Sequence, residues 1–418
     1  MGVISDLAED SWTGKIAPRE LWRPTGCVEE IDRDVFFVHA FGNVTALRTE
    51  AGVVLIDTGS YARRTQTHAA VRSVAPGPVF AAIYTHGHVD HACGLSPFLA
   101  EATERRWSRP RIVGHRNVSA RFARYRATRA FNALINARQF STAATWPADY
   151  DDPDTVYDAH FDLEAGDARL ALRHGRGETD DHTWIWWAER KILFTGDFFL
   201  WVAPNAGNPQ KVQRYATEWA AALRAMETRG AETLVPGHGM PIFGAGRVRQ
   251  ALADTAAWLE HLVGETVARM NAGATLDAIL AEVKPPPALA DRPYLQAVYD
   301  EPEYVVRNIW RLYGGWYDGI PAHLQPASEA ALGREVAALA GGIPALVARA
   351  RALATAGDLR LAGHLIDWAA AADATSHEAH AARAEIYAAR AETATALMTR
   401  GIFSATSRES AEKSRPAD

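Results

Sequence analysis

The sequence predicts an α/β protein, in which a sandwich of two β-sheets flanked by helices is followed by an all-helical, tetratricopeptide-like domain. Three observations lead to this prediction. The 418 residues exceed the length of one ordinary domain. Over the first ~250 residues, short apolar segments punctuated by glycine alternate with segments of helical spacing. After Gly246 the strand signals stop, and the chain becomes helical in spacing and rich in alanine.

The expected strands are short apolar runs, and the expected helices lie between them. The strands are predicted at 34–40, 43–48, 53–57, 79–84, 111–114, 168–172, 183–187, 191–197 and 233–235. The helices are predicted at 61–74, 117–140 and 209–228. Because strands are followed by helices twice over, we expect two sheets in the middle and helices outside.

The second part of the chain has a helix–turn–helix rhythm. Residues 343–400 read as helices broken at 357–358 and at 373–376, with many small residues, as in tetratricopeptide packing. One such unit cannot cover its own apolar face, so we expect it to pack on the first domain or on a second copy of the chain. The expected domains are 1–250 and 251–405, followed by a flexible tail at 406–418.

Composition argues against several classes of function. The net charge of −6 gives no support to nucleic-acid binding as the main activity. The two cysteines cannot form a disulfide framework, and their number fits a reducing compartment. The N-terminal residues lack the apolar stretch of a signal peptide, and no run approaches ~18 apolar residues. We therefore expect a cytoplasmic protein that binds neither nucleic acid nor membranes.

The most informative stretch follows the predicted strand at 79–84. Three imidazoles and one carboxylate fall within six residues there, namely His86, His88, Asp90 and His91. Neutral imidazole and carboxylate are good ligands for zinc and similar divalent ions, and paired ions are a known hydrolytic arrangement. A surface loop rich in histidine, with no metal, is the alternative. The spacing favours a dinuclear metal site.

Three further strand ends offer ligands. Asp197 closes the strand at 191–197, and its two oxygens can each bind one ion. His238 follows the strand at 233–235. The remaining ligand must come from 174–182, where the residues alone leave several choices open: His174, Glu178, Asp180, Asp181 and His182. Asp57, which ends a neighbouring strand, is expected to orient a ligand imidazole.

The predicted helix at 117–140 is unusually rich in arginine. A solvated, ion-paired helix face is one interpretation. The other is that part of this segment lines a pocket for an anionic substrate, with Tyr125 and Asn132 among the contacts.

The series His-x-His-x-Asp-His, then Gly-Asp, then Gly-His resembles the metallo-β-lactamase superfamily, whose αββα sandwich carries a dinuclear metal site. The resemblance covers roughly residues 30–245. In most members a Gly-His pair supplies a ligand about nineteen residues before the bridging acid, and counting back from Asp197 gives Glu178. Glutamate at that position resembles the alkyl sulfatases, and residues 305–321 resemble the start of their helical dimerisation domain. The resemblance therefore also implies a homodimer formed through the helical domain.

The resemblance implies a ligand assignment. One ion would be held by His86, His88 and Glu178, and a second by Asp90, His91 and His238, with Asp197 and a hydroxide between them. Asp90 is expected to be a catalytic residue as well as a ligand. Zinc is the first expectation for both ions, although manganese and iron suit the same mixed ligands.

The sequence departs from the sulfatase pattern at several positions. The bridging acid is Asp197 rather than glutamate. Asn205 matches a sulfate-contacting asparagine, but Gln210 replaces the arginine five residues further on, so we expect Lys211 or Arg214 to supply the positive charge. Gln325 replaces a histidine that would donate a proton to the leaving group, which leaves His323 as the candidate acid. The family's lipid-carrier-like domain is not present in this sequence, so we expect a smaller ester than a micellar detergent.

The function predicted from the sequence is hydrolysis of an alkyl sulfate or a related anionic ester. The cleaved bond, C–O or S–O, stays open. A lactone, carboxylic or phosphoric ester hydrolase on the same site is one alternative. A non-catalytic helical scaffold with an idle metal site is another.

Overall fold

The computed structural model describes residues 2–17 and 20–415, which form two compact units. The first unit contains residues 1–132 and 146–313, and the second contains 133–145 and 314–418. This division differs from the boundary expected at residue 250, because the helices that follow that residue pack with the sheets of the first unit.

The first unit contains two β-sheets, as the sequence predicts. One has seven strands in chain order: β1 (Val28–Asp32), β2 (Val35–Val38), β3 (Val44–Thr49), β4 (Gly52–Ile56), β5 (Val79–Ile83), β6 (Arg111–His115) and β7 (Thr155–Tyr157). Strands β1 to β4 pair antiparallel as a meander, and β4 to β7 pair parallel. The carboxyl ends of the parallel strands β4, β5 and β6 therefore lie at one edge of the sheet.

The second sheet has six strands in the order β13-β12-β11-β10-β9-β8. Their bounds are β8 (His160–Ala165), β9 (Ala168–His174), β10 (Thr183–Trp187), β11 (Ile192–Gly196), β12 (Thr233–Pro236) and β13 (Ile242–Phe243). Strands β11 and β12 are parallel, so Asp197 and His238, which follow them, leave the sheet in the same direction.

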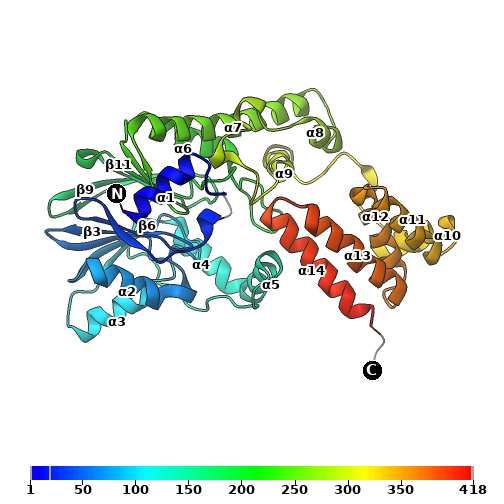
Figure 1. Cartoon of the computed structure of the whole chain (residues 1–418), viewed down its shortest axis with the longest axis horizontal. Helices are drawn as coiled ribbons and strands as arrows, with labels where there is room; N and C mark the ends of the chain where they lie inside the picture. Colours follow the sequence, from blue (N-terminus) through cyan, green and yellow to red (C-terminus); the bar gives the residue numbers. More distant parts are fainter. Residues whose placement is uncertain (1, 18–19, 416–418) are drawn as a thin grey trace. The chain divides into compact units, whose positions relative to one another are not determined.

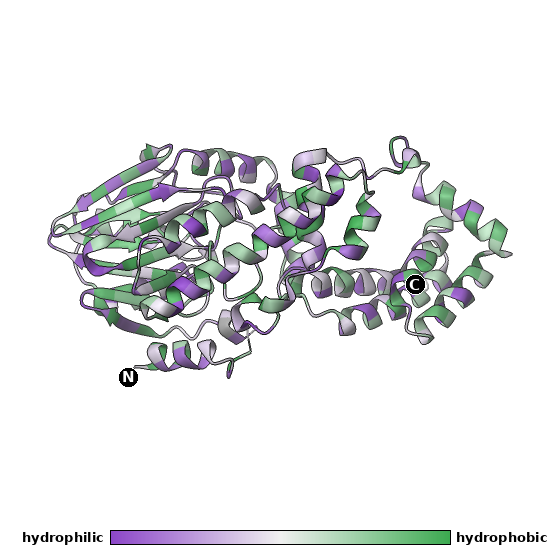
Figure 2. Cartoon of the chain, turned by 90° about the horizontal axis from the view of Figure 1, so that it is seen from above, coloured by the Kyte–Doolittle hydropathy of each residue, from purple (hydrophilic) through white to green (hydrophobic). Residues whose placement is uncertain are grey.

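Alternation of side chains along the strands builds the layers. Val35 and Phe37 belong to the core between the sheets, whereas Phe36 and Val38 belong to a second core beneath the helices on the outer face. Figure 2 shows the resulting bands of hydrophobic residues along the strands. In Figure 1 helices α2 and α3 lie on one side of the strands and α6 and α7 on the other, which is the predicted αββα arrangement.

The helices of the first unit surround the sheets or lead away from them. Their bounds are α1 (Val3–Trp12), α2 (Arg64–Val74), α3 (Ser96–Glu104), α4 (Asn117–Ala127), α6 (Ala216–Glu227), α7 (Ala245–Asn271), α8 (Leu276–Glu282) and α9 (Pro302–Gly314). Short 3-10 turns lie at Glu20–Trp22, Tyr61–Arg63, Ala188–Arg190, Pro287–Leu289 and Pro293–Leu295.

Two expected helices have different limits in the structure. The helix predicted at 117–140 is two helices, α4 and α5 (Arg129–Phe140), because the chain leaves helical geometry at Thr128. The helix predicted from residue 209 begins only at Ala216. Residues 209–215 instead form an irregular segment, and this segment brings two cations towards the candidate site.

The second unit is helical, as predicted. Its helices are α10 (Glu329–Ala340), α11 (Ile343–Thr355), α12 (Leu359–Ala372), α13 (His377–Thr393) and α14 (Leu397–Lys413), preceded by a 3-10 turn at Pro321–His323. Asp358 and Ser376 cap α12 and α13 at the predicted breaks. The tail expected from residue 406 is helical as far as Lys413, and residues 416–418 lie outside the described part of the chain.

Within the described residues, no single helix is long and apolar enough to cross a membrane. Helices α10 and α11 meet the length and composition requirement only as a pair, and they are bent by 87°.

Candidate metal centre

The histidine loop leaves the carboxyl end of β5 and is held by the neighbouring strand end. Asp57, just after β4, has a left-handed backbone with φ of 57°. Its Oδ1 accepts the backbone N–H of Thr85 at 2.7 Å, and its Oδ2 accepts the Thr85 hydroxyl at 2.8 Å. The same Oδ2 lies 2.8 Å from Nδ1 of His91. Asp57 therefore orients an imidazole of the loop, as the sequence predicts.

The structure brings all seven predicted ligand residues together. They form two groups, and within each group the possible ligand atoms lie within 4.8 Å of one another. One group contains His86, His88, Glu178 and Asp197, and the other contains Asp90, His91 and His238. All but His88 and Asp90 are buried.

Asp197 connects the two groups. Its Oδ1 lies 3.3 Å from Nε2 of His91, and its Oδ2 lies 3.6 Å from Nε2 of His86 and 3.4 Å from Nε2 of His238. The close approach depends on Gly237, because a Cβ atom there would lie 2.2 Å from Oδ1 of Asp197. Asp90 belongs to the second group, with its Oδ2 3.5 Å from Nε2 of His238.

Hydrogen bonds fix which nitrogen of three imidazoles faces the centre. Nδ1 of His91 donates to Asp57, and Nδ1 of His238 donates to the carbonyl of Phe41. The Thr85 hydroxyl donates to Asp57, so it accepts from Nδ1 of His86 at 3.0 Å. In each of these rings Nε2 is left to face the other ligands.

These nitrogens meet in pairs that require a proton or a cation between them. Nε2 of His86 lies 2.9 Å from Nδ1 of His88, and Nε2 of His91 lies 3.2 Å from Nε2 of His238. Two lone pairs at such distances repel unless a proton or a cation lies between them. In addition, Glu178 Oε2 and Asp197 Oδ1 are buried and have no hydrogen-bond partner among the described residues. The donor set therefore fits divalent metal ions.

The environment divides the imidazoles into two kinds. Burial lowers the pKa of His86 and His88 well below the usual value, and nearby cationic side chains lower that of His88 further. Burial also acts on His91 and His238, but the carboxylates of Asp197 and Asp90 outweigh it and raise the pKa of both. Neutral rings suit metal binding, and a proton can replace the cation at the second pair when no ion is bound.

Glu178 is buried together with two donors. Nη1 of Arg214 lies 2.7 Å from its Oε1, and Nδ2 of Asn205 donates to the same oxygen at 2.8 Å. Arg214 also donates to the backbone carbonyl of Asn205. Burial raises the pKa of Glu178 to about 7, although Arg214 acts in the opposite direction. Asn205 and Arg214 were expected to contact substrate, and in the structure their polar groups face Glu178.

Lys211 is the other predicted cation, and it is half-buried. Its Nζ lies 5.9 Å from the centre of the Trp146 ring. Burial and the charge of Arg214 lower the pKa of Lys211 to about 8, while Glu178, Asp90 and Asp300 act against this shift. Lys211 thus lies within electrostatic reach of both ligand groups.

The remaining predicted contacts have other surroundings. Tyr125 is buried in the outer core, with its ring 5.2 Å from that of Trp146. Asn132 is buried and donates to the Thr128 hydroxyl at 2.8 Å. His323 is in the second unit, where its exposed ring lies 2.6 Å from Oδ2 of Asp318. Substrate contact by the first two, and proton donation by the third, stay predictions.

Several supporting residues could not be predicted individually. Asp181 Oδ2 accepts the N–H of Gly87, between two ligand histidines, and forms an ion pair with Arg121 at 2.9 Å. His182 uses its Nε2 to accept the N–H of Asp197. The arginine-rich segment was the only sequence signal, and it does not single out Arg121 as the buried member.

Aromatic rings lie beside the second group of ligands. The Trp22 ring stacks on that of His238 at 5.0 Å, and Tyr299 lies 4.7 Å from Trp22. These residues come from segments far apart in the sequence, and no pattern linked them.

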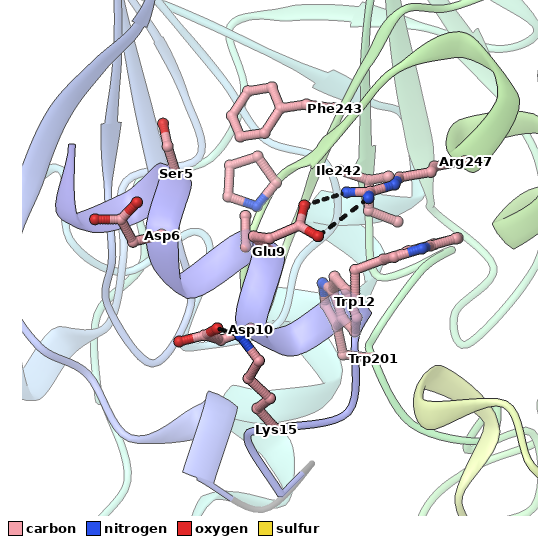
Figure 3. A pocket seen from close by; sticks show the side chains of 12 residues that line it. Ser5, Asp6, Glu9, Asp10, Trp12, Lys15, Trp201, Ile242, Phe243 and Arg247 are labelled. Carbon is pink, nitrogen blue, oxygen red and sulfur yellow. Dashed lines mark hydrogen bonds and ion pairs between the residues drawn. The ribbon is translucent and has the colours of Figure 1, made fainter. Parts of the chain in front are cut away.

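A separate cavity of about 830 Å³ lies beside α1 and contains none of the candidate site residues (Figure 3). Trp12, Trp201 and Phe243 are among its lining residues. Its charged groups include two ion pairs, Glu9 with Arg247 and Asp10 with Lys15. This cavity is distinct from the candidate metal centre.

Comparison with known proteins agrees with the geometry. The family profile described as metallo-beta-lactamase superfamily matches residues 39–238, a range that includes all seven predicted ligands. This part of the chain is therefore a metallo-β-lactamase domain. A second profile, described as alkyl sulfatase dimerisation, matches residues 275–413. The chain therefore combines a metallo-β-lactamase domain with a region that matches the alkyl sulfatase dimerisation family.

Two sequence relatives of the chain are alkylsulfatases. The chain is 26% identical over 349 residues to a linear primary-alkylsulfatase of Pseudomonas sp. (strain ATCC 19151). This match covers 78% of this chain and 64% of the relative. It is 28% identical over 373 residues to an (R)-specific secondary-alkylsulfatase of Pseudomonas sp.. This match covers 82% of this chain and 56% of the relative. The chain thus spans less than two thirds of the length of these curated relatives.

A solved structure shows the shared fold. The stereoselective inverting sec-alkylsulfatase Pisa1 from Pseudomonas sp. superposes with a TM-score of 0.80 at 22% identity, covering 94% of this chain and 66% of that one.

Proposed function

We propose that this chain is a metal-dependent hydrolase that cleaves small alkyl sulfate esters at a dinuclear centre. The observation that carries the proposal is the set of seven converging ligand residues, in which Asp197 contacts members of both groups. The alkylsulfatase relatives support sulfate esters as the substrate class.

The proposed ligand assignment follows the two groups. His86, His88 and Glu178 would hold one ion, Asp90, His91 and His238 the other, and Asp197 would be shared. When bound, the ions supply Lewis acidity and lower the pKa of a water molecule towards neutrality. Zinc is the proposed metal, because nitrogen and oxygen ligands in small number suit it.

Residues of the chain itself would bind the two ends of the ester. Lys211 is the cation best placed for the sulfate group, because the guanidinium of Arg214 is already paired with Glu178. Trp22, which stacks on His238, and Tyr299, which lies beside Trp22, offer an apolar surface for the alkyl group. Asp318 binds Nδ1 of His323, which leaves Nε2 as the nitrogen that could donate a proton to the leaving alcohol.

We also propose that the chain forms a homodimer through its helical domain. The match to a dimerisation family supports this, as do large apolar side chains that are exposed in the second unit, such as Leu339 at 87% and Trp316 at 69%. Light scattering coupled to gel filtration tests this proposal, and a Leu339→Glu variant should shift the dimer towards monomer. A monomeric wild type would contradict it.

The proposed reaction is tested with a substrate panel on protein loaded with zinc. We expect turnover of short alkyl sulfates and little turnover of lactones, carboxylic esters or phosphodiesters at the same metal content. The reverse ranking would favour one of the other esterase activities and contradict the sulfatase proposal. A wild-type protein that takes up less than about one ion per chain would favour a scaffold.

The bond that breaks is tested separately in water labelled with oxygen-18. Label in the alcohol indicates attack on carbon, and label in the sulfate indicates attack on sulfur. A cytoplasmic location stays a prediction, which cell fractionation tests.

A further inference from the structure

Arg214 differs from the other cations near the centre because its guanidinium is already paired with a buried carboxylate. Its side chain is 3% exposed, and Nη1 lies 2.7 Å from Oε1 of Glu178, itself 5% exposed. A buried carboxylate without a counter-ion is costly, and this arginine supplies the counter-ion. Because a buried and paired guanidinium is poorly available to a second anion, the contact argues against substrate binding by Arg214.

The two oxygens of Glu178 have different partners. Oε1 receives two donors, the guanidinium of Arg214 and the side-chain amide of Asn205. Oε2 is buried and has no hydrogen-bond partner among the described residues. Two donors on one oxygen restrict the rotation of the carboxylate, and they leave the other oxygen without a hydrogen-bond partner.

The backbone that carries Arg214 is itself held on two sides. Its carbonyl accepts from Nδ2 of Asn308 at 2.8 Å and from Nε2 of Gln213 at 2.9 Å. The next residue, Tyr215, donates its N–H to the carbonyl of Gly177 at 3.0 Å, directly before Glu178. The arginine and the glutamate are thus tied together through backbone as well as side-chain contacts.

We propose that Arg214 is a positioning residue that fixes Glu178 as a metal ligand, so that binding of the ion at His86, His88 and Glu178 depends on this arginine. The inference rests on the metal centre of the proposed function. It assigns Arg214 to the metal site rather than to the substrate.

The test measures zinc affinity by competition with a chromogenic chelator, without any substrate. For Arg214→Met we expect a loss of about 10- to 100-fold in affinity at one of the two ions and little change at the other, as for other residues that orient ligands. Arg214→Lys should recover part of the loss, because lysine restores the positive charge but not the planar guanidinium with its several N–H donors. The control is Arg224→Met, which removes an arginine paired with Glu260 at the surface and should bind zinc like the wild type.

A second pair of variants separates positioning from a general structural role. Glu178→His replaces the carboxylate by a neutral ligand, which needs no counter-ion. The double variant Glu178→His with Arg214→Met should therefore bind zinc more tightly than Arg214→Met alone. Loss that is equal in both would overturn the inference, because the arginine would then act independently of the glutamate.

The outcomes distinguish this inference from the proposed function. If Arg214→Met binds both ions like the wild type, the inference is wrong and the metal centre still stands. If the wild type binds no zinc, the proposed function fails first. Should Arg214→Met not fold, Arg214→Lys and Asn205→Ala decide, since each is expected to weaken the same ion, and wild-type affinity in both would contradict the inference.

Discussion

Oδ1 of Asp197 lies 3.3 Å from Nε2 of His91, and the other oxygen of that carboxylate faces His86 and His238. One side chain therefore contacts imidazoles of both ligand groups. This relationship supports a shared carboxylate between two ions, and it makes Asp197 the residue on which both ions should depend.

Replacing Asp197 by asparagine should weaken the binding of both metal ions. The amide keeps the shape but loses the negative charge that offsets the ions, so we expect zinc content to fall and turnover to drop by about 100-fold or more. Zinc content is measured by elemental analysis after dialysis. Asp162→Asn, which removes a surface carboxylate paired with Arg173, is the control and should keep its zinc. Full zinc occupancy in Asp197→Asn would contradict the shared role.

Replacing Asp57 by alanine should affect the second ion more than the first. Asp57 holds Nδ1 of His91 at 2.8 Å, and loss of such an orienting carboxylate costs about 10- to 100-fold in metal affinity. Titration of the metal-free protein with zinc should show one weakened site and one nearly unchanged. Equal weakening of both sites would indicate that the whole loop had moved, since Asp57 also holds Thr85.

The affinity for anionic substrate should fall as the pH rises through about 8. The pKa of Lys211 is lowered to about 8 by burial, so its ammonium form predominates below that pH and is lost above it. Bound metal ions would shift the loss to lower pH, because they add positive charge. We expect KM for an alkyl sulfate to rise across this range in the wild type.

The matched variants for that experiment are Lys211→Met and Lys211→Arg. The methionine variant should have a raised KM that no longer changes in this range, and the arginine variant should keep a low KM to higher pH. A wild-type KM that is constant from pH 6 to pH 9 would exclude Lys211 as the sulfate contact.

Replacing Arg121 by methionine should destabilise the protein by about 3–5 kcal/mol, because it leaves the buried carboxylate of Asp181 without its partner. Urea unfolding of metal-free protein at pH 7 measures the effect. The control, Arg116→Met, breaks an exposed ion pair with Asp158 and should cost less than about 1 kcal/mol. Equal effects in the two variants would contradict a structural role for the buried pair.

The sign of the pH dependence follows from the same pair. Burial raises the pKa of Asp181, but Arg121 outweighs it, and the net pKa in the folded protein is lowered. The stabilisation is therefore present above the unfolded pKa of about 3.9 and is lost as the pH falls through the lower folded value. In Arg121→Met this acid-dependent loss of stability should be smaller.

The sequence predicted nine of the strands and the ligands, because both follow from local patterns, but it missed β1, β7, β8 and β13. Apolar runs that end in His86, Asp197 or His238 locate strand ends, and parallel strands bring such ends to one edge. Glu178 could be selected only by the resemblance to a family, since the stretch around it holds other possible ligands.

Features set by long-range contacts could not be predicted. The segment at 209–215 has helical spacing, yet it stays irregular because Arg214 pairs with Glu178 and Tyr215 bonds to Gly177. Likewise, the boundary expected at residue 250 differs from the division of the structure because α7 packs with the sheets, which its sequence does not reveal. The stacking of Trp22 on His238 joins segments too far apart for any local pattern.

The central claim is that Asp197 lies between two metal ions, and anomalous X-ray scattering at the zinc absorption edge tests it most directly. We expect about two peaks per chain in a zinc-loaded crystal, one beside His86 and His88 and one beside His91 and His238, with the carboxylate of Asp197 reaching both. A single peak, or peaks away from Asp197, would contradict the account.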